Sequence, residues 1–240
     1  MIIDFHSHIL PDLDDGAENV AESLRLLKML KKDGVDIVVA TPHLYPHRDS
    51  ASSFLKNREE SAGILKDAMK DGDYPKVVLG AEVYFLDGIY NLPLDKLCIG
   101  DTDYLLLELP YMNFDDDFMD SFANFMNSCK VKIILAHIER YFDFSEAKRV
   151  FEIISYGLPA QGNCDSLLSV RTRRYTLDLI KNGKINLLGT DLHSIRRRPP
   201  RFKEAEQVIR KSLSADVFEN MMRTAEEVLN SKKDKENQKL

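Results

Sequence analysis

The chain has 240 residues, 44% of them hydrophobic, which is enough to bury one large core or two smaller ones. Its formal net charge of −6 leaves no basic footprint and argues against nucleic acid as a partner. The sequence opens directly on a strand-like segment and contains no apolar run of about 18 residues, so we expect a cytoplasmic protein that is not membrane-embedded.

Short apolar, β-branched runs alternate with helical patterns along most of the chain. Seven runs predict strands: IIDF from Ile2, DIVVATP from Asp36, KVVLGAEV from Lys76, YLLLELP from Tyr104, KIILAHI from Lys132, LPAQGN from Leu158 and INLLGTD from Ile185. Helical spacing covers 18–34, 117–129, 145–157, 202–213 and 216–229, and 45–70 is helical and polar. The helix over 145–157 is expected to open on Ser145 as N-cap and to close on Gly157.

Repeated strand–helix units of this length predict an α/β fold with a parallel sheet and right-handed crossovers. About seven units indicate a barrel of the TIM type or one unit short of it, and a doubly wound open sheet is the alternative. No linker rich in Pro, Gly or Ser divides the chain, so we expect a single domain over 1–230. The charged segment 231–240 is expected to be a frayed tail.

Residues that bind metals gather where the predicted strands end. Five of the six histidines lie at or just past a strand's C-terminal end: His6, His8, His43, His137 and His193, with His47 a few residues beyond. Acidic residues share this placement: Glu82, Glu108 and Asp191, with Asp14 and Asp15 after the first strand. Active sites of parallel barrels are assembled at this rim, which favours a common site.

The spacing of these residues supports shared ligation. His6 and His8 are two apart on an extended segment, so both side chains project to one face, and Asp191 and His193 are expected to repeat that geometry on the last strand. Imidazole and carboxylate ligands suit Zn, Fe or Mn, and the number of candidates exceeds what one metal takes. Any one of these residues alone would be interpreted as a hydrogen-bonded structural group. The joint pattern predicts two or three divalent metal ions.

The segments DFHSHILPDLDDG, ATPH, GAEVYF, LLLELP, AHIERY and GTDLHSIRRRPP resemble the motifs of the PHP (polymerase and histidinol phosphatase) superfamily. Within it they are similar to the bacterial capsule-type protein-tyrosine phosphatases, the CpsB/CapC/YwqE group. The resemblance runs from the first strand to the helix after the last. It implies a distorted (βα)7 TIM-like barrel that hydrolyses phosphotyrosine, on the tail of a bacterial tyrosine kinase controlling capsular or exopolysaccharide synthesis.

The resemblance also implies roles for individual residues. It assigns a first metal to His6, His8, Glu82 and Asp191, a second to bridging Glu82 with Glu108 and His137, and a third to Asp15, His43 and His193. Manganese is the expected metal, with Fe or Zn as alternatives. Arg140 and Arg198 match the phosphate-binding arginines, and Arg196 or Arg197 could take the place of Arg198. The segment QGNCDS departs from the family pattern, with Cys164 in place of a small residue.

This reading predicts attack of an activated water on the phosphorus of a phosphomonoester, with Arg140 and Arg198 holding phosphoryl oxygens. His47 and Asp14 both remain open as a general acid. A cysteine mechanism needs a Cx5R loop, and the residue six after Cys164 is Val170 rather than arginine. The alternatives are a small-molecule phosphatase of the histidinol phosphate kind and a structural metal centre in a regulatory subunit. The two arginines count against the latter.

Overall fold

The computed structural model describes residues 1–231, so the predicted tail lies, apart from Ser231, outside the described residues. The strands are β1 (Ile3–Ser7), β2 (Ile37–Ala40), β3 (His43–Leu44), β4 (Lys76–Leu79), β5 (Glu82–Tyr84), β6 (Tyr104–Glu108), β7 (Lys132–Leu135), β8 (Gln161–Asn163) and β9 (Leu187–Gly189). The helices are α1 (Val20–Lys32), α2 (Ala51–Ala68), α3 (Asp116–Ser128), α4 (Ala147–Ile154), α5 (Cys164–Leu168), α6 (Arg173–Lys181), α7 (Phe202–Ser212) and α8 (Ala215–Asn230). Three short 3-10 helices are η1 (Ile89–Asn91), η2 (Leu94–Lys96) and η3 (Ile138–Asp143).

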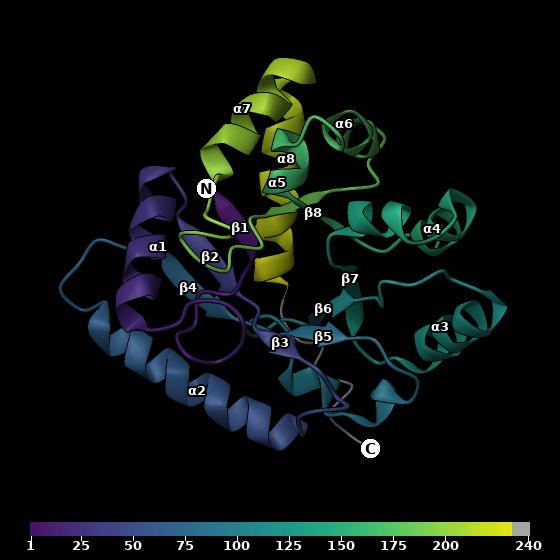
Figure 1. The fold of residues 1–240 in the computed structure, drawn as a ribbon, viewed down its shortest axis with the longest axis horizontal. Coiled ribbons are helices and arrows are strands. Elements are labelled where there is room, and N and C mark those ends of the chain that lie inside the picture. The colour runs from purple at the N-terminus through teal and green to yellow at the C-terminus, as the bar shows by residue number, and fades with distance from the viewer. Residues whose placement is uncertain (232–240) are drawn as a thin grey trace.

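The strands pair in parallel throughout and form three sheets, in the orders β1-β2-β4, β3-β5-β6-β7 and β8-β9. Helices α1, α2, α3, α4 and α6 lie around the outside of the strands in Figure 1. The fold is therefore mixed α/β with parallel sheets. The single closed ladder of a (βα)7 barrel is not seen in the described residues, and neither is one doubly wound sheet. Isolated parallel bridges join Ser7 to Leu192 and Leu135 to Ala160, across the gaps between sheets.

Two predicted strands are each broken into two. The second run ends at Ala40 and resumes at His43, since Pro42 in between has no N–H to donate. The third run breaks at Gly80, where a Cβ would lie 3.0 Å from Ile99 Cγ1. The two broken strands stay paired across the break, because Gly80 N donates to Ala40 O (2.8 Å) and Glu82 N donates to Pro42 O (3.0 Å).

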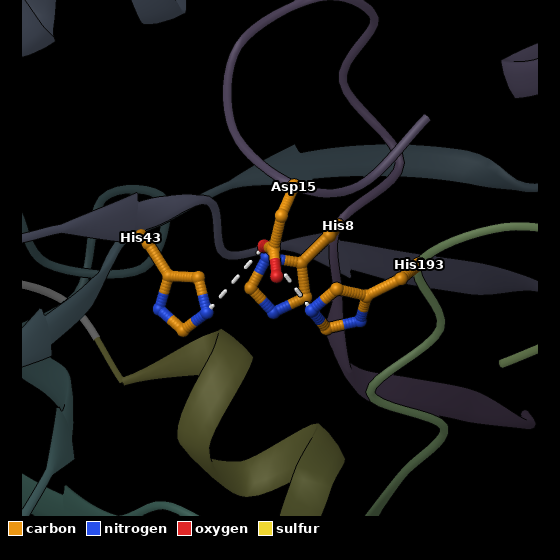
Figure 2. Close-up of side chains that lie close together, drawn as sticks. All are labelled: His8, Asp15, His43 and His193. Atoms are coloured by element: carbon orange, nitrogen blue, oxygen red, sulfur yellow. Dashed lines mark ion pairs between the residues drawn. The ribbon is translucent and has the colours of Figure 1, made fainter. Parts of the chain in front are cut away.

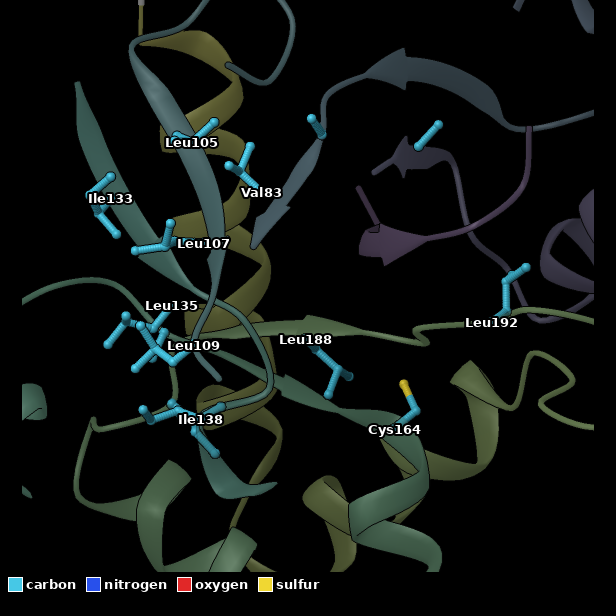
Figure 3. Close-up of a cluster of buried hydrophobic side chains, with 14 of the residues drawn as sticks. Val83, Leu105, Leu107, Leu109, Ile133, Leu135, Ile138, Cys164, Leu188 and Leu192 are labelled. Carbon is cyan, nitrogen blue, oxygen red and sulfur yellow. The ribbon is translucent and has the colours of Figure 1, made fainter. Parts of the chain in front are cut away.

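Each central strand is buried on both faces, as parallel strands covered by helices are. One face points to the helices, and Figure 3 shows part of this cluster, with side chains of β5, β6, β7 and β9 packed together. The opposite face forms a second cluster with contributions from all three sheets and from α8: Ile3, Phe5, Ile37, Val39, Ile99, Leu106, Ile134, Ala136, Leu187, Ala225 and Val228. The three sheets thus share one apolar core, although no continuous ladder of hydrogen-bonded strands joins them in the described part of the chain.

The predicted helices are present, with one error at a helix start. The Asn19 side chain caps α1, and Gly157, after α4, has the positive φ (73°) that favours glycine. Ser145 is not the N-cap of α4: that position is Glu146, without a side-chain cap. Ser145 Oγ instead accepts a hydrogen bond from Phe114 N (3.0 Å), a buried backbone donor that the tertiary fold brings next to it.

A buried carboxylate ties the first strand to the segment after the last. Asp4 is fully buried and accepts hydrogen bonds from Thr190 N (2.8 Å) and Thr190 Oγ1 (2.5 Å). Burial raises the pKa of Asp4 to about 6 in spite of these hydrogen bonds, so the carboxylate depends on both donors.

We therefore expect Thr190→Val, which keeps the shape and removes the hydroxyl, to lower the free energy of unfolding by about 1–3 kcal/mol. Urea unfolding measures the change. Thr224→Val is the control, because that hydroxyl donates only to Asn220 O on the exposed side of α8. Equal stability of the Thr190→Val variant and the unaltered protein would contradict the role of this contact.

Candidate metal centre

All the residues predicted as metal ligands come together at the C-terminal ends of the strands. His6 belongs to β1, His43 to β3, Glu82 to β5 and Glu108 to β6, while His8, Asp15, His137, Asp191 and His193 follow strand ends. Their donor atoms form four overlapping groups: His8–Asp15–His43–His193, His6–Glu82–His137, His6–His8–Asp191 and His43–Glu82–Glu108. Residues from opposite ends of the sequence, such as His6 and His193, thus share one site.

The set expected for the first metal (His6, His8, Glu82 and Asp191) has four donor atoms with near-tetrahedral spacing. His6 Nε2 and His8 Nε2 lie 3.2 Å apart, and each lies 3.1–3.6 Å from Glu82 Oε2 and Asp191 Oδ1. Donors about 2.0–2.2 Å from one tetrahedral ion stand roughly 3.3–3.6 Å apart. Burial alone would lower the pKa of His6, yet Glu82 and Asp191 raise it above its usual value. These residues fit a single cation.

Glu82 joins this group to a second one. Its Oε1 lies 2.8 Å from His137 Nε2, which is 3.6 Å from Glu108 Oε1. Burial first, and then the charge of Glu82, raises the pKa of Glu108 to about 9. Glu108 Oε2 and His43 Nδ1 are buried 3.7 Å apart, and neither makes a hydrogen bond within the described part of the chain. Such orphaned donor atoms fit a second cation.

The set expected for the third metal is shown in Figure 2, where Asp15 lies between His43 and His193 with His8 behind them. Asp15 Oδ1 is 3.3 Å from His193 Nε2 and 3.8 Å from His43 Nε2. His43 Nδ1, the other ring nitrogen, lies 3.1 Å from Glu82 Oε2. His43 therefore lies between the second and third sets, and the resemblance assigns it to the third.

Two of these residues adopt backbone conformations that L-residues rarely take. His137 has a φ of 29° and Asp191 a φ of 51°. The expectation that Asp191 and His193 lie on the last strand is therefore wrong, because β9 ends at Gly189. The turn instead aims Asp191 Oδ1 at His6 and His8. Strained backbone of this kind clusters at functional sites, where the surrounding structure holds it.

Asp14 orients the histidines rather than joining the ligand groups. Its Oδ2 lies 2.7 Å from His8 Nδ1 and accepts from His43 N (2.9 Å). The loop can approach this closely because of Gly16, where a Cβ would lie 2.2 Å from His8 O. With Nδ1–H donated to Asp14, the Nε2 of His8 is free to bind a metal.

Gln161 and Asn163 form a supporting relay that sequence reasoning missed. Gln161 Oε1 lies 3.0 Å from His6 Nδ1, and Gln161 Nε2 donates to Asn163 Oδ1 (2.8 Å). Asn163 Nδ2 in turn donates to Asp191 Oδ2 (2.7 Å). The available signal was two polar side chains, two residues apart on one buried strand, which point the same way. Both residues belong to the QGNCDS segment, in which Cys164 departs from the family pattern.

Arg140 and Arg198 converge on the oxygen of Asp191 that faces away from the histidines. Arg140 Nη2 lies 2.8 Å and Arg198 Nη1 2.9 Å from Asp191 Oδ2. Both guanidiniums line a pocket of about 430 Å³ with the candidate metal ligands, and they are 29% and 32% exposed. Arg196 and Arg197 line a different groove.

Cys164 is 1% exposed and packs in the apolar core near Leu188 and Leu192, so it does not reach the pocket (Figure 3). Burial raises the pKa of its thiol well above the usual value, which disfavours a nucleophilic thiolate. His47 contacts the rings of Tyr45 and Tyr84 and belongs to none of the four ligand groups.

Over the described residues, none of the helices has the length and apolarity needed to cross a membrane.

We expect Asp14→Asn to weaken metal binding about 10- to 100-fold, because it removes the charge that orients His8 and leaves the ligands in place. Calorimetric titration of the metal-free protein with Mn²⁺ measures this. Asp71→Asn, an exposed acid outside the site, is the matched control. Unchanged affinity in Asp14→Asn would show that the His8 contact has no part in holding metal.

Known proteins resemble this chain along most of its length. Tyrosine-protein phosphatase CpsB of Streptococcus agalactiae serotype III (strain NEM316) is 27% identical over 219 residues, covering 87% of this chain and 89% of that protein. Tyrosine-protein phosphatase YwqE of Bacillus subtilis (strain 168) is 26% identical over 239 residues, covering 95% and 91%.

A solved structure agrees with the fold. It comes from a study of YwqE from Bacillus subtilis and CpsB from Streptococcus pneumoniae, described as metal-dependent tyrosine phosphatases. It superposes with a TM-score of 0.80 at 22% identity, covering 96% of this chain and 95% of that one. Residues 2–230 match the family described as "Capsular polysaccharide synthesis, CpsB/CapC". The chain therefore belongs to the CpsB/CapC family.

Proposed function

We propose that this protein is a metal-dependent phosphomonoesterase that removes the phosphoryl group from phosphotyrosine in proteins. One observation carries the proposal: overlapping His and carboxylate groups and two partly exposed arginines line the same open pocket. Metal ions held by these donors and the guanidinium groups would both bind phosphoryl oxygens, so the combination is suited to a phosphoryl group. The names of the CpsB and YwqE relatives support a tyrosine-protein phosphatase.

The proposed ligands are the residues described above, in three overlapping sets. His6, His8, Glu82 and Asp191 make up the first, Glu82, Glu108 and His137 the second, and Asp15, His43 and His193 the third. The mixture of imidazole and carboxylate donors supports two or three divalent ions, of which Mn is favoured and Fe or Zn are alternatives. Such ions supply a nucleophilic water at neutral pH and Lewis acidity toward phosphoryl oxygens.

The arginines have a different role from the ligands. Arg140 and Arg198 bind the phosphoryl oxygens and stabilise the charge that develops during transfer. Both side chains are already held by Asp191 Oδ2, so little freedom is lost when substrate binds. Asp191 meanwhile presents its other oxygen to His6 and His8. It thereby fixes the phosphate-binding arginines relative to the first metal set.

The partner is a phosphotyrosine-bearing protein, and we propose the tail of a bacterial tyrosine kinase of capsular or exopolysaccharide synthesis. The family description supports the link to capsular polysaccharide synthesis. The runner-up, a histidinol-type small phosphomonoester, carries an amine that calls for a free acidic group in the pocket. Asp143 at the rim is ion-paired with Arg171 instead. A purely structural metal centre would not require two partly exposed arginines facing the pocket.

We also propose that residues 1–230 form one domain, a distorted seven-unit barrel of the PHP type. The shared inner cluster of β1, β2, β6, β7 and β9 supports this, as do the bridges at Ser7 and Leu135 between sheets. Counted in this way, β2 continues into β3 and β4 into β5, which brings nine short strands to seven units. The active site would then lie at the rim that such barrels use.

The proposed activity is tested by metal removal and substrate comparison on one preparation. Chelation should abolish hydrolysis of a phosphotyrosine peptide, Mn²⁺ should restore it, and thiol alkylation should leave it largely intact, since Cys164 is buried. We expect much slower hydrolysis of a phosphoserine peptide and of histidinol phosphate. Higher kcat/KM for histidinol phosphate than for any phosphotyrosine peptide would favour the runner-up.

A second experiment separates the arginines from the ligands. Arg198→Ala should retain its metals and lose about 10²–10³-fold in kcat, because a preorganised charge is removed. Arg196→Ala is the matched control two residues away and should behave like the unaltered protein. Metal analysis accompanies the kinetics. An Arg198→Ala protein that lacks metal would show that this arginine acts through Asp191 instead of on phosphate.

A further inference from the structure

Two aromatic side chains lie exposed where the metal pocket opens to solvent. Tyr111 is 39% exposed and Phe144 is 49% exposed, and both line the pocket that holds Arg140 and Arg198. Their ring centroids are 5.0 Å apart with the planes inclined at 48°. Single exposed apolar side chains are ordinary, but two rings in contact at the mouth of a charged pocket form an apolar surface next to a polar one.

The rings are fixed relative to the phosphate-binding residues. The Tyr111 hydroxyl accepts a hydrogen bond from Arg140 Nη1 (3.2 Å), and its ring stacks on His137 at 5.9 Å. Phe144 directly follows η3, the short helix that carries Arg140, and its N–H donates to Tyr141 O (3.0 Å). Arg140 and Phe144 therefore lie on one segment, and the Tyr111 hydroxyl joins the second ring to it.

We infer that Tyr111 and Phe144 form an aryl shelf, a surface that receives the phenyl ring of the phosphotyrosine substrate and so selects aryl over alkyl phosphomonoesters. The inference rests on the proposed function and names the selectivity of that site. A phosphoryl group at Arg140 and Arg198 leaves the attached phenyl ring directed to the pocket mouth. Aromatic rings prefer tilted or offset contacts at about 4.5–7 Å, a geometry that this pair of rings already adopts.

Phe144 is the side chain of the shelf with most surface to offer. Within the described residues its ring contacts a single other aromatic ring, that of Tyr111. Tyr45 also lines the pocket, but its ring already stacks on His43 at 4.9 Å and lies under the Arg48 guanidinium at 4.9 Å. A serine phosphate has no ring for this surface and would leave Phe144 exposed.

The test compares two competitive inhibitors, phenylphosphonate and methylphosphonate, on Mn²⁺-loaded protein. Phe144→Ala should weaken phenylphosphonate about 3- to 10-fold, the usual value of one aromatic contact, and leave methylphosphonate unchanged. The KM for a phosphotyrosine peptide should rise with little change in kcat. Phe151→Ala is the matched control, since Phe151 is 47% exposed and lines a separate pocket on α4.

Equal weakening of both phosphonates, or of neither, in Phe144→Ala would overturn the aryl shelf. The same holds if Phe151→Ala reproduces the selective loss. Thermal unfolding of both variants checks that they are folded, and direct calorimetric binding of the two phosphonates needs no turnover. A protein that hydrolyses no phosphotyrosine peptide but prefers phenylphosphonate through Phe144 would contradict the proposed function and leave the shelf standing.

Discussion

Several carboxylates are buried close together at the ends of parallel strands, and the rest of the site depends on how their charge is balanced. Glu82 and Asp191 are almost fully buried, and each faces more than one histidine. Anionic groups so close together are costly without compensating cations. Part of the compensation comes from Arg140 and Arg198. The remaining donors face one another at distances suited to metal ions.

Asp191 connects the candidate metal ligands to the two arginines. One oxygen faces His6 and His8, and the other receives both arginines and the amide of Asn163. The left-handed backbone at Asp191 makes this double presentation possible, because the turn directs the carboxylate back over the strand ends. A phosphoryl group bound here would meet metals and guanidiniums in a fixed relation. Preorganisation of this kind is a main source of catalytic power.

The supports of the site are distributed over the whole fold. Asp14 comes from the loop after β1, Gln161 and Asn163 from β8, and Tyr111 follows β6. Parallel strands bring these distant segments to one rim, where side chains two residues apart on a strand point the same way. The apolar cluster inside the three sheets holds the strands in register. The chemistry is thus a consequence of parallel packing combined with polar residues confined to strand ends.

Sequence alone placed most of the strands and predicted helices and the candidate ligands at strand ends, because apolar runs and the placement of His6, His8 or Glu82 relative to them are local patterns. Tertiary structure alone decided the division into three sheets, since pairing depends on contacts between segments far apart in the chain. It also decided that Ser145 bonds to Phe114, that His43 lies between two ligand groups and that Asp191 leaves its strand. In the sequence Gln161 and Asn163 look like ordinary polar residues, and only the fold places them in hydrogen-bond contact with His6 and Asp191. Such assignments depend on which distant donors a side chain meets, and one-dimensional spacing does not encode that.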